Sequence, residues 1–538
     1  HIDGNIFARP IVSMNRIFSA QGYRFYQSSY DEDLEGSWLS VNYDPWGTGI
    51  TYTGFCLMGL GCLLLLCARD GGFRRLLRHP QIRKGGLFLI ALFGGCQLKA
   101  DPALPVVKRV QADSLAIQQV VYNDRVAPFN TLARDFVQKI YGRPSFHRIT
   151  PEQVVSSWML YPEEWNRTPI IRIKNQELRT ALGLKEEYAS LNHLFDGTQY
   201  KLQPLWQREQ GNRSKLAQAI QETDEKVGLI LMLRQGTLIR PLPPDVTPLS
   251  TQKVNAELWY NRIPFSKILF MVNLTLGFAA FGLFMFRMLT NRKEKAVSRR
   301  VWGTALCLTT LFHATGYALR GYIRSGFPLS NGYETMQFVA LAVLLTACLL
   351  QRRFPFTRPF GFLLSGFTLL VAYLGEMNPQ ITPLMPVLAS PWLSWHVSLI
   401  MISYGLFAFT FLNGILALCL IGKQKNTASP ITREQIEQLT LLSRLLLYPG
   451  TFLLGTGIVL GAVWANVSWG SYWSWDPKEV WALAAFIIYG ISFHRKSLPC
   501  FQRPWLFHGY MIFAFAVVLM TYFGVNYLLG GMHSYANS

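Results

Sequence analysis

The sequence predicts a mainly α-helical, polytopic membrane protein with about ten membrane helices and an extracytoplasmic soluble domain. Half of the 538 residues are hydrophobic, and only 15% are charged. The apolar residues gather in long runs that are separated by basic loops. The net charge is +20, but the basic residues lie between apolar runs and not on a soluble, aromatic-poor domain. This pattern indicates membrane topology and argues against nucleic acid as a partner.

Ten apolar runs are predicted to be membrane helices, and their boundaries are uncertain by several residues. They are 49–68, 86–99, 264–286, 301–319, 335–350, 359–375, 396–421, 446–465, 479–494 and 505–527. The run 86–99 gives the weakest signal, and it is a span, a half-inserted segment or an anchor.

The basic residues are unevenly divided between the two sides of the predicted membrane. Twenty-two Lys and Arg residues lie in the loops 69–85, 287–300, 351–358, 422–445 and 495–503. The opposite short loops and the C-terminal tail carry three, Arg320, Arg324 and Lys478. The positive-inside rule therefore places the first set in the cytoplasm and the opposite loops outside.

This topology divides the chain into four parts. Residues 1–48 are the tail of an extracytoplasmic domain, and 49–99 hold two membrane helices with a basic cytoplasmic loop. Residues 100–263 are an extracytoplasmic soluble domain without a catalytic motif, interpreted as a packing or docking domain. Residues 264–538 hold eight membrane helices. The chain begins with His and inside a domain, so we expect it to be N-terminally truncated.

The eight cysteines exclude several kinds of site. They never occur as C-x-x-C. The chain therefore has no zinc knuckle, no thioredoxin-type pair and no C-x-x-C-H haem attachment site of its own.

A tryptophan-rich loop, 464–481, reads WANVSWGSYWSWDPKEVW. Its end, Asp476-Pro477-Lys478-Glu479, predicts a helix start with a capping box. Asp476 is either this cap alone or also a group that acts on a ligand. Trp469 and Trp473 would share one face if that piece is helical. With Trp475 they predict a rigid aromatic platform for a large, planar, apolar ligand.

Two histidines identify that ligand as haem. His396 opens a membrane helix on the outer side, and His533 follows the last helix on the same side. Two imidazoles beside an aromatic platform suit a haem b iron with bis-histidine ligation. His494, at the cytoplasmic end of its helix, is either functional or interfacial. His313 is expected to be buried and hydrogen-bonded, and His508 to be interfacial.

Several motifs resemble a known family. The stretch WGSYWSWDPKEVWAL is similar to the WWD signature of haem-handling proteins of cytochrome c biogenesis. SPWLSWHV, FPLSNGYET and FGVNYLLGGMHSYA resemble its CcsA (ResC) branch, over roughly 264–538. GYRFYQSSYDED and DPWGTGITYTG resemble the ResB (CcsB) partner. The chain therefore resembles a fused ResB–CcsA cytochrome c synthetase of System II.

The resemblance implies a haem exporter and a holocytochrome-c-synthase-type lyase. His396 and His533 would hold haem outside, beside Trp469, Trp473, Trp475 and Asp476, and His494 would be one of two intramembrane ligands. The implied partners are C-x-x-C-H apocytochromes c, thiol-reducing proteins of the outer compartment and membrane lipid. The implied location is the bacterial inner membrane, with the WWD loop and the C-terminus periplasmic.

Two alternatives remain open. One is a haem-binding exporter or chaperone without ligase activity, and the other is a bis-histidine electron-transfer protein.

Overall fold

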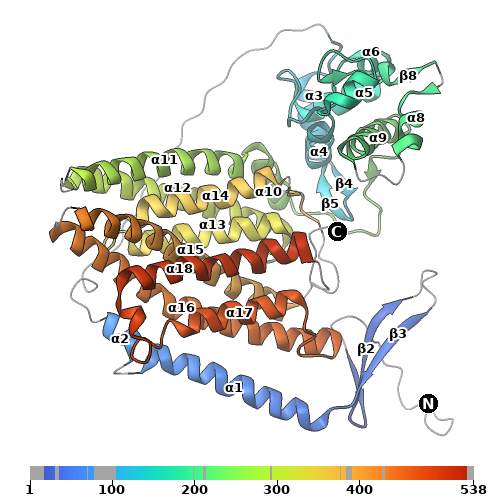
Figure 1. Cartoon of the computed structure of the whole chain (residues 1–538). Helices are drawn as coiled ribbons and strands as arrows, with labels where there is room; N and C mark the ends of the chain where they lie inside the picture. The colour runs from blue at the N-terminus through green and yellow to red at the C-terminus, as the bar shows by residue number, and fades with distance from the viewer. Residues whose placement is uncertain are drawn as a thin grey trace.

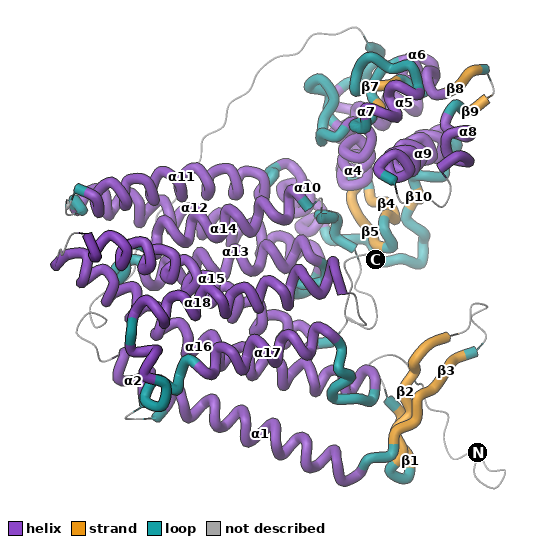
Figure 2. Tube along the Cα trace, viewed as in Figure 1, coloured by secondary structure: helices purple, strands orange, loops and turns teal. Residues whose placement is uncertain are grey.

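The computed structural model shows a helix bundle, a globular unit and an N-terminal β-sheet (Figure 1). Helix dominates, which confirms the mainly α class (Figure 2). The structure describes residues 12, 17–30, 36–68, 71–77, 104–197, 199–209, 214–290, 292, 294–375, 377–382, 390–426 and 430–529.

Nine helices in the described part of the chain make up the bundle. They are α1 (Pro45–Cys67), α11 (Phe265–Leu289), α12 (Ala296–Arg324), α13 (Gly332–Leu350), α14 (Thr357–Leu374), α15 (Pro391–Asn426), α16 (Pro430–Trp469), α17 (Pro477–Ile491) and α18 (Pro504–Leu519). Among the described residues, seven of them, all except α12 and α17, are long and apolar enough to cross a membrane.

Nine of the ten predicted runs fall on these helices, and 86–99 lies outside the described residues. The other two helices, α12 and α17, are not long and apolar enough to count as membrane spans, for different reasons. α12 has 29 residues, but Thr, Gly and His residues in its central stretch make it less apolar than the other long helices, while α17 has only 15 residues. α17 ends at Ile491, so the predicted boundary at His494 was wrong by three residues.

α15 and α16 pack as antiparallel neighbours, and glycines bring them close. A Cβ atom at Gly450 would lie 2.7 Å from the ring of Phe407, and one at Gly457 would lie 2.7 Å from Ile400. The hydroxyl of Ser403 donates to the carbonyl of Gly450 over 2.8 Å. Small residues allow this close backbone approach between membrane helices.

A buried ion-pair network closes the end of the bundle where α12 meets α13. Glu334 accepts from Arg320 and Arg324, each at 2.7 Å, and its side chain is fully buried. Arg320 also donates to the backbone carbonyls of Pro379 at 2.7 Å and Gln380 at 3.0 Å. The buried charges are thus paired, and the same arginine holds the segment that precedes α15.

The globular unit spans 104–262. Its elements are α3 (Arg109–Ala116), β4 (Gln119–Tyr122), β5 (Arg125–Pro128), α4 (Phe129–Tyr141), α5 (Pro151–Leu160), α6 (Pro162–Arg167), β6 (Ile171–Arg172), α7 (Gln176–Ala181), β7 (Tyr188–Ala189), a 3₁₀ turn (Asn192–Leu194), β8 (Phe195–Asp196), β9 (Gln199–Tyr200), α8 (Leu202–Glu209), α9 (Lys215–Arg234), β10 (Arg240–Pro241) and α10 (Thr251–Arg262). Its strands form small antiparallel sheets, the largest in the order β10-β4-β5. Trp158 and Trp165 stack at 5.8 Å within its apolar core.

Polar contacts join this unit to the bundle. Arg125 of β5 donates to the carbonyl of Ile381 at 2.8 Å and pairs with Glu257 of α10. Asn123, in the β4–β5 turn, donates to Gln380 at 3.2 Å. The segment 377–382 is therefore held by the globular unit on one side and by Arg320 on the other.

A three-stranded antiparallel sheet precedes α1. It consists of β1 (Phe18–Ala20), β2 (Tyr23–Tyr30) and β3 (Ser37–Asn42), in that order. Asp44 starts α1 by accepting from the backbone amide of Gly47 at 2.8 Å. α1 lies along α16, and the short helix α2 (Gly72–Leu77) follows it (Figure 1).

We predict that the stability of the globular unit depends on pH, because the unit contains a buried carboxylic acid. Burial raises the pKa of Asp135, on α4, to about 6. Because the folded state binds a proton that the unfolded state releases near pH 4, stability should fall as pH rises from about 4 through 6. Asp135→Asn should remove this dependence and raise stability at pH 7.5, by at most about 3 kcal/mol.

Thermal unfolding of wild type and Asp135→Asn at pH 5 and pH 7.5 checks this expectation. A stability difference between the two proteins that stays the same at both pH values would contradict it.

Candidate functional site

The tryptophan-rich loop predicted over 464–481 is shorter in the structure, where 470–476 joins α16 to α17 at one end of the bundle (Figure 1). α16 stops at Trp469 because Gly470 adopts a left-handed conformation with φ of +78°. α17 starts at Pro477 with Asp476 as its cap. The Asp476 carboxylate accepts from the amide of Lys478 at 3.2 Å, and Glu479 accepts from the amide of Asp476 at 3.2 Å. The predicted capping box is confirmed.

The tryptophans of this segment do not form a single aromatic platform. Trp464 is buried inside α16, and Trp473 lies beyond the helix end, so the helical pairing of Trp469 with Trp473 was wrong. The Trp469 side chain is not among the described groups. Trp473 and Trp475 meet edge to face at 6.0 Å. They form a corner, in which Trp475 is 75% exposed and has a φ of +58°.

The N-terminal sheet and α1 hold the beginning of this loop. Asn42 of β3 donates to the carbonyl of Gly470 at 2.7 Å. Tyr26 of β2 is 1% exposed and lies against Gly470, where a Cβ atom would be 2.7 Å from its ring. Tyr52 of α1 contacts Tyr472 edge to face at 5.7 Å. No local pattern in the sequence predicted these contacts.

His396 lies in the second turn of α15, against α16. Its Nδ1 atom is 2.6 Å from the carbonyl oxygen of Gly457. A carbonyl only accepts, so the proton resides on Nδ1 and the lone pair on Nε2. This is the usual preparation of a metal-binding imidazole, in which a backbone carbonyl orients the ring. The iron-ligand role of His396 stays a prediction.

The C-terminal segment returns to the tryptophan loop. α18 continues as a π-helical stretch, Met520–Leu529. Lys478 donates to Asn526 of this stretch at 3.0 Å, and Thr521 donates to the carbonyl of Trp481. His533 itself lies outside the described residues. The described chain therefore ends four residues before His533, on a segment that is attached to α17.

The remaining histidines of the bundle have different surroundings. His494 is exposed, in a turn after α17. His313 is buried and hydrogen-bonded to Gln337 at 3.0 Å, as predicted. His508 was predicted to be interfacial, but it is fully buried and bonds Thr440 at 2.9 Å. That prediction was wrong because the partner comes from α16, far away in the sequence.

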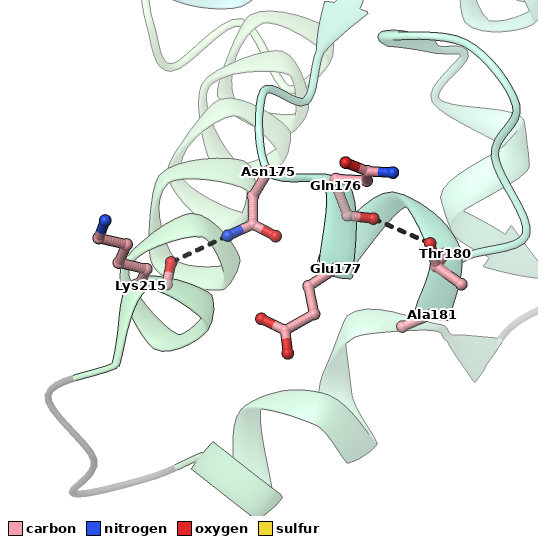
Figure 3. A pocket seen from close by; sticks show the side chains of 6 residues that line it. All are labelled: Asn175, Gln176, Glu177, Thr180, Ala181 and Lys215. Atoms are coloured by element: carbon pink, nitrogen blue, oxygen red, sulfur yellow. Dashed lines mark hydrogen bonds between the residues drawn. The ribbon is translucent and has the colours of Figure 1, made fainter.

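A depression of about 730 Å³ lies on the globular unit (Figure 3). It is lined by Asn175, Gln176, Glu177, Thr180, Ala181 and Lys215. Asn175 caps α7 by accepting from Leu178, and it donates to the carbonyl of Lys215. These are bonds that start a helix and join α7 to α9. Within the described residues, no three His, Cys, Asp or Glu side chains gather around a common metal position.

Comparison with known proteins places these features in a family. Residues 329–533 match the family described as "Cytochrome C assembly protein". The protein NrfI of Wolinella succinogenes is 32% identical, over 98% of this chain and 67% of its own length. The CcsA protein of a Synechococcus strain (CC9902) is 32% identical, over 48% of this chain and 95% of its own length. The chain belongs to the CcsA family of cytochrome c biogenesis proteins.

The relatives match different shares of this chain. The CcsA protein of Chlamydomonas reinhardtii is 34% identical and covers 46% of this chain, whereas NrfI covers nearly all of it. The stretch 329–533 contains His396, the tryptophan loop, His494 and His533. The predicted site residues therefore all fall in the part of this CcsA-family chain that matches the assembly family.

The contact between Gly470 and Tyr26 gives a testable prediction. Gly470→Ala adds a Cβ atom against the Tyr26 ring and strains a left-handed residue. We expect a loss of about 2–5 kcal/mol of stability, since the backbone strain costs about 1–2 kcal/mol and overpacking about 1–3 kcal/mol. Thermal unfolding and tryptophan fluorescence report the change.

Gly236→Ala is the matched control, because Gly236 has a φ of +72° and nothing within 4 Å of the added atom. It should show the backbone cost alone. Equal effects at Gly470 and Gly236 would show that the contact with Tyr26 is unimportant.

Proposed function

We propose that this chain exports haem across the membrane and attaches it covalently to C-x-x-C-H apocytochromes c on the outer face. The observation that carries the proposal is His396, whose Nδ1 atom bonds the Gly457 carbonyl on the helix that ends in the tryptophan loop. Membership of the CcsA family supports haem-related cytochrome c maturation. Haem is the substrate and not a resident cofactor.

In this proposal the outer site holds haem b between two imidazoles. His396 supplies one axial nitrogen, and His533 supplies the other from the segment that follows Leu529. The Trp473–Trp475 corner packs against an edge of the porphyrin, and Trp469 extends that surface. The capped start of α17 at Asp476 fixes the position of the Trp473–Trp475 corner.

Haem attachment needs no nucleophile from this chain. Each thiol of the apocytochrome adds across one vinyl group, so that sulfur bonds to one vinyl carbon and hydrogen to the other. Both cysteines must arrive reduced, which requires thiol-reducing proteins in the outer compartment. The chain contributes position and orientation, which lower the barrier by holding the partners together. One histidine leaves the iron when the substrate histidine binds.

Haem reaches this site from the cytoplasmic side in the proposed orientation. The basic segments, including 422–445 and 495–503, face the cytoplasm of a bacterial inner membrane. His494 lies at that end, after α17, and is proposed to bind haem during uptake. A second uptake ligand would belong to a ResB-like segment, and roughly residues 1–70 are proposed to be part of that module.

Coexpression with a C-x-x-C-H apocytochrome tests the proposal. We expect haem that stays on the cytochrome after denaturation, and none on a substrate whose two cysteines are alanine. Replacing both His396 and His533 by alanine should abolish the low-spin haem spectrum of the purified protein and the covalent product.

Two outcomes would contradict this. Haem bound to the chain without any covalent product indicates an exporter alone. A low-spin spectrum that survives the double change shows that the ligand assignment is wrong.

Variants at Asp476 separate a helix cap from a charge that acts on haem. Haem retention should rank wild type, then Asn, then Ala at this position, because Asn caps about as well as Asp and Ala costs roughly 1 kcal/mol. Trp473→Ala or Trp475→Ala should retain least, since covering an aromatic side chain with the porphyrin is worth about 2–3 kcal/mol. Haem content per protein is the measurement. If Asn proves as damaging as Ala, the carboxylate charge itself acts on haem or a histidine.

A further inference from the structure

The seam between α15 and α16 has a regular pattern. Facing pairs recur at whole helical turns. Phe407 lies against Gly450, Ile400 lies against Gly457 two turns further on, and His396 lies against Gly461 one turn beyond that. The imidazole of His396 is thus the outermost side chain of a row that packs on the α16 backbone. A Cβ atom at Gly461 would lie 2.6 Å from both Cε1 and Nδ1 of the ring.

Two neighbouring glycines act on the same ring in different ways. Gly457 contributes its carbonyl oxygen, 2.6 Å from Nδ1. Gly461 lies one turn further along α16. It leaves room for the ring because it has no side chain, whereas the Cβ atom of any other residue would clash with the ring. The hydrogen bond fixes the tautomer, and the space fixes the angle of the ring.

We infer that Gly461 is a positioning residue for His396, and that it holds the imidazole so that Nε2 faces the haem iron. This inference rests on the proposed function for the identity of the ligand, but the placement of the ring stands on the geometry alone. α16 extends only eight residues from Gly461 to Trp469, about 12 Å of helix. One helix therefore fixes both the ligand and the start of the aromatic loop.

The test compares Gly461→Ala with Gly422→Ala in the full chain. Gly422 lies on α15, the helix that carries His396, and has nothing within 4 Å of an added Cβ atom. We expect Gly461→Ala to lose most of the low-spin haem signal and Gly422→Ala to keep it. Added imidazole should restore the low-spin signal of Gly461→Ala, as it should for His396→Gly, whereas a generally misfolded bundle would not respond.

A haem-free measurement separates this inference from the proposed function. The ¹⁵N spectrum of labelled histidines, assigned with His396→Gln, should show the proton of His396 on Nδ1 in wild type and Gly422→Ala. In Gly461→Ala that signal should shift or broaden, because the ring leaves the Gly457 carbonyl.

Each outcome has a definite meaning. A wild-type tautomer and a wild-type haem spectrum in Gly461→Ala would overturn the inference while leaving the proposed function intact. If His396→Ala keeps its low-spin haem, the ligand assignment in the proposed function fails. The tautomer measurement then decides by itself whether Gly461 positions the ring.

Discussion

Close contact between α15 and α16 is the constraint on which the candidate site depends. Bare backbone at Gly450 and Gly457 lets the two helices approach until Phe407 and Ile400 touch the opposite main chain. In a membrane, where lipid is as apolar as leucine, such packing contributes much of the association between helices. The helix pair delivers two features to one end of the bundle, the imidazole of His396 and the start of the tryptophan loop.

Segment 377–382, which precedes α15 in the chain, is held from two sides. Segment 377–382 lies between Arg320 of the bundle and Arg125 of the globular unit, and both guanidinium groups donate to its carbonyls. Glu334 balances Arg320 inside the protein, where removing one partner of a buried pair typically costs about 3–5 kcal/mol. The globular unit therefore contributes to the framework of the membrane bundle, although it carries no catalytic motif.

The sequence predicted what depends on neighbours in the chain. Apolar runs located the helices, and the spacing of Asp476 and Glu479 located a helix start, because these signals are local. Interactions between distant segments were not predictable in this way. His508 looked interfacial beside Pro504, but α16 supplies a partner 68 residues away. The expected helical pairing of Trp469 and Trp473 was wrong because Gly470, in a left-handed conformation, ends α16 between them.

The hydrogen bond from Asn42 to Gly470 joins residues that are 428 positions apart. The donor residue and the acceptor residue are therefore synthesised at very different times. At about 5–20 residues per second, a ribosome needs about 20–90 s to make the intervening chain. The N-terminal sheet must wait at the membrane surface for that interval, with Tyr26 still uncovered. The contact that holds the tryptophan loop can consequently form only after Gly470 has been synthesised.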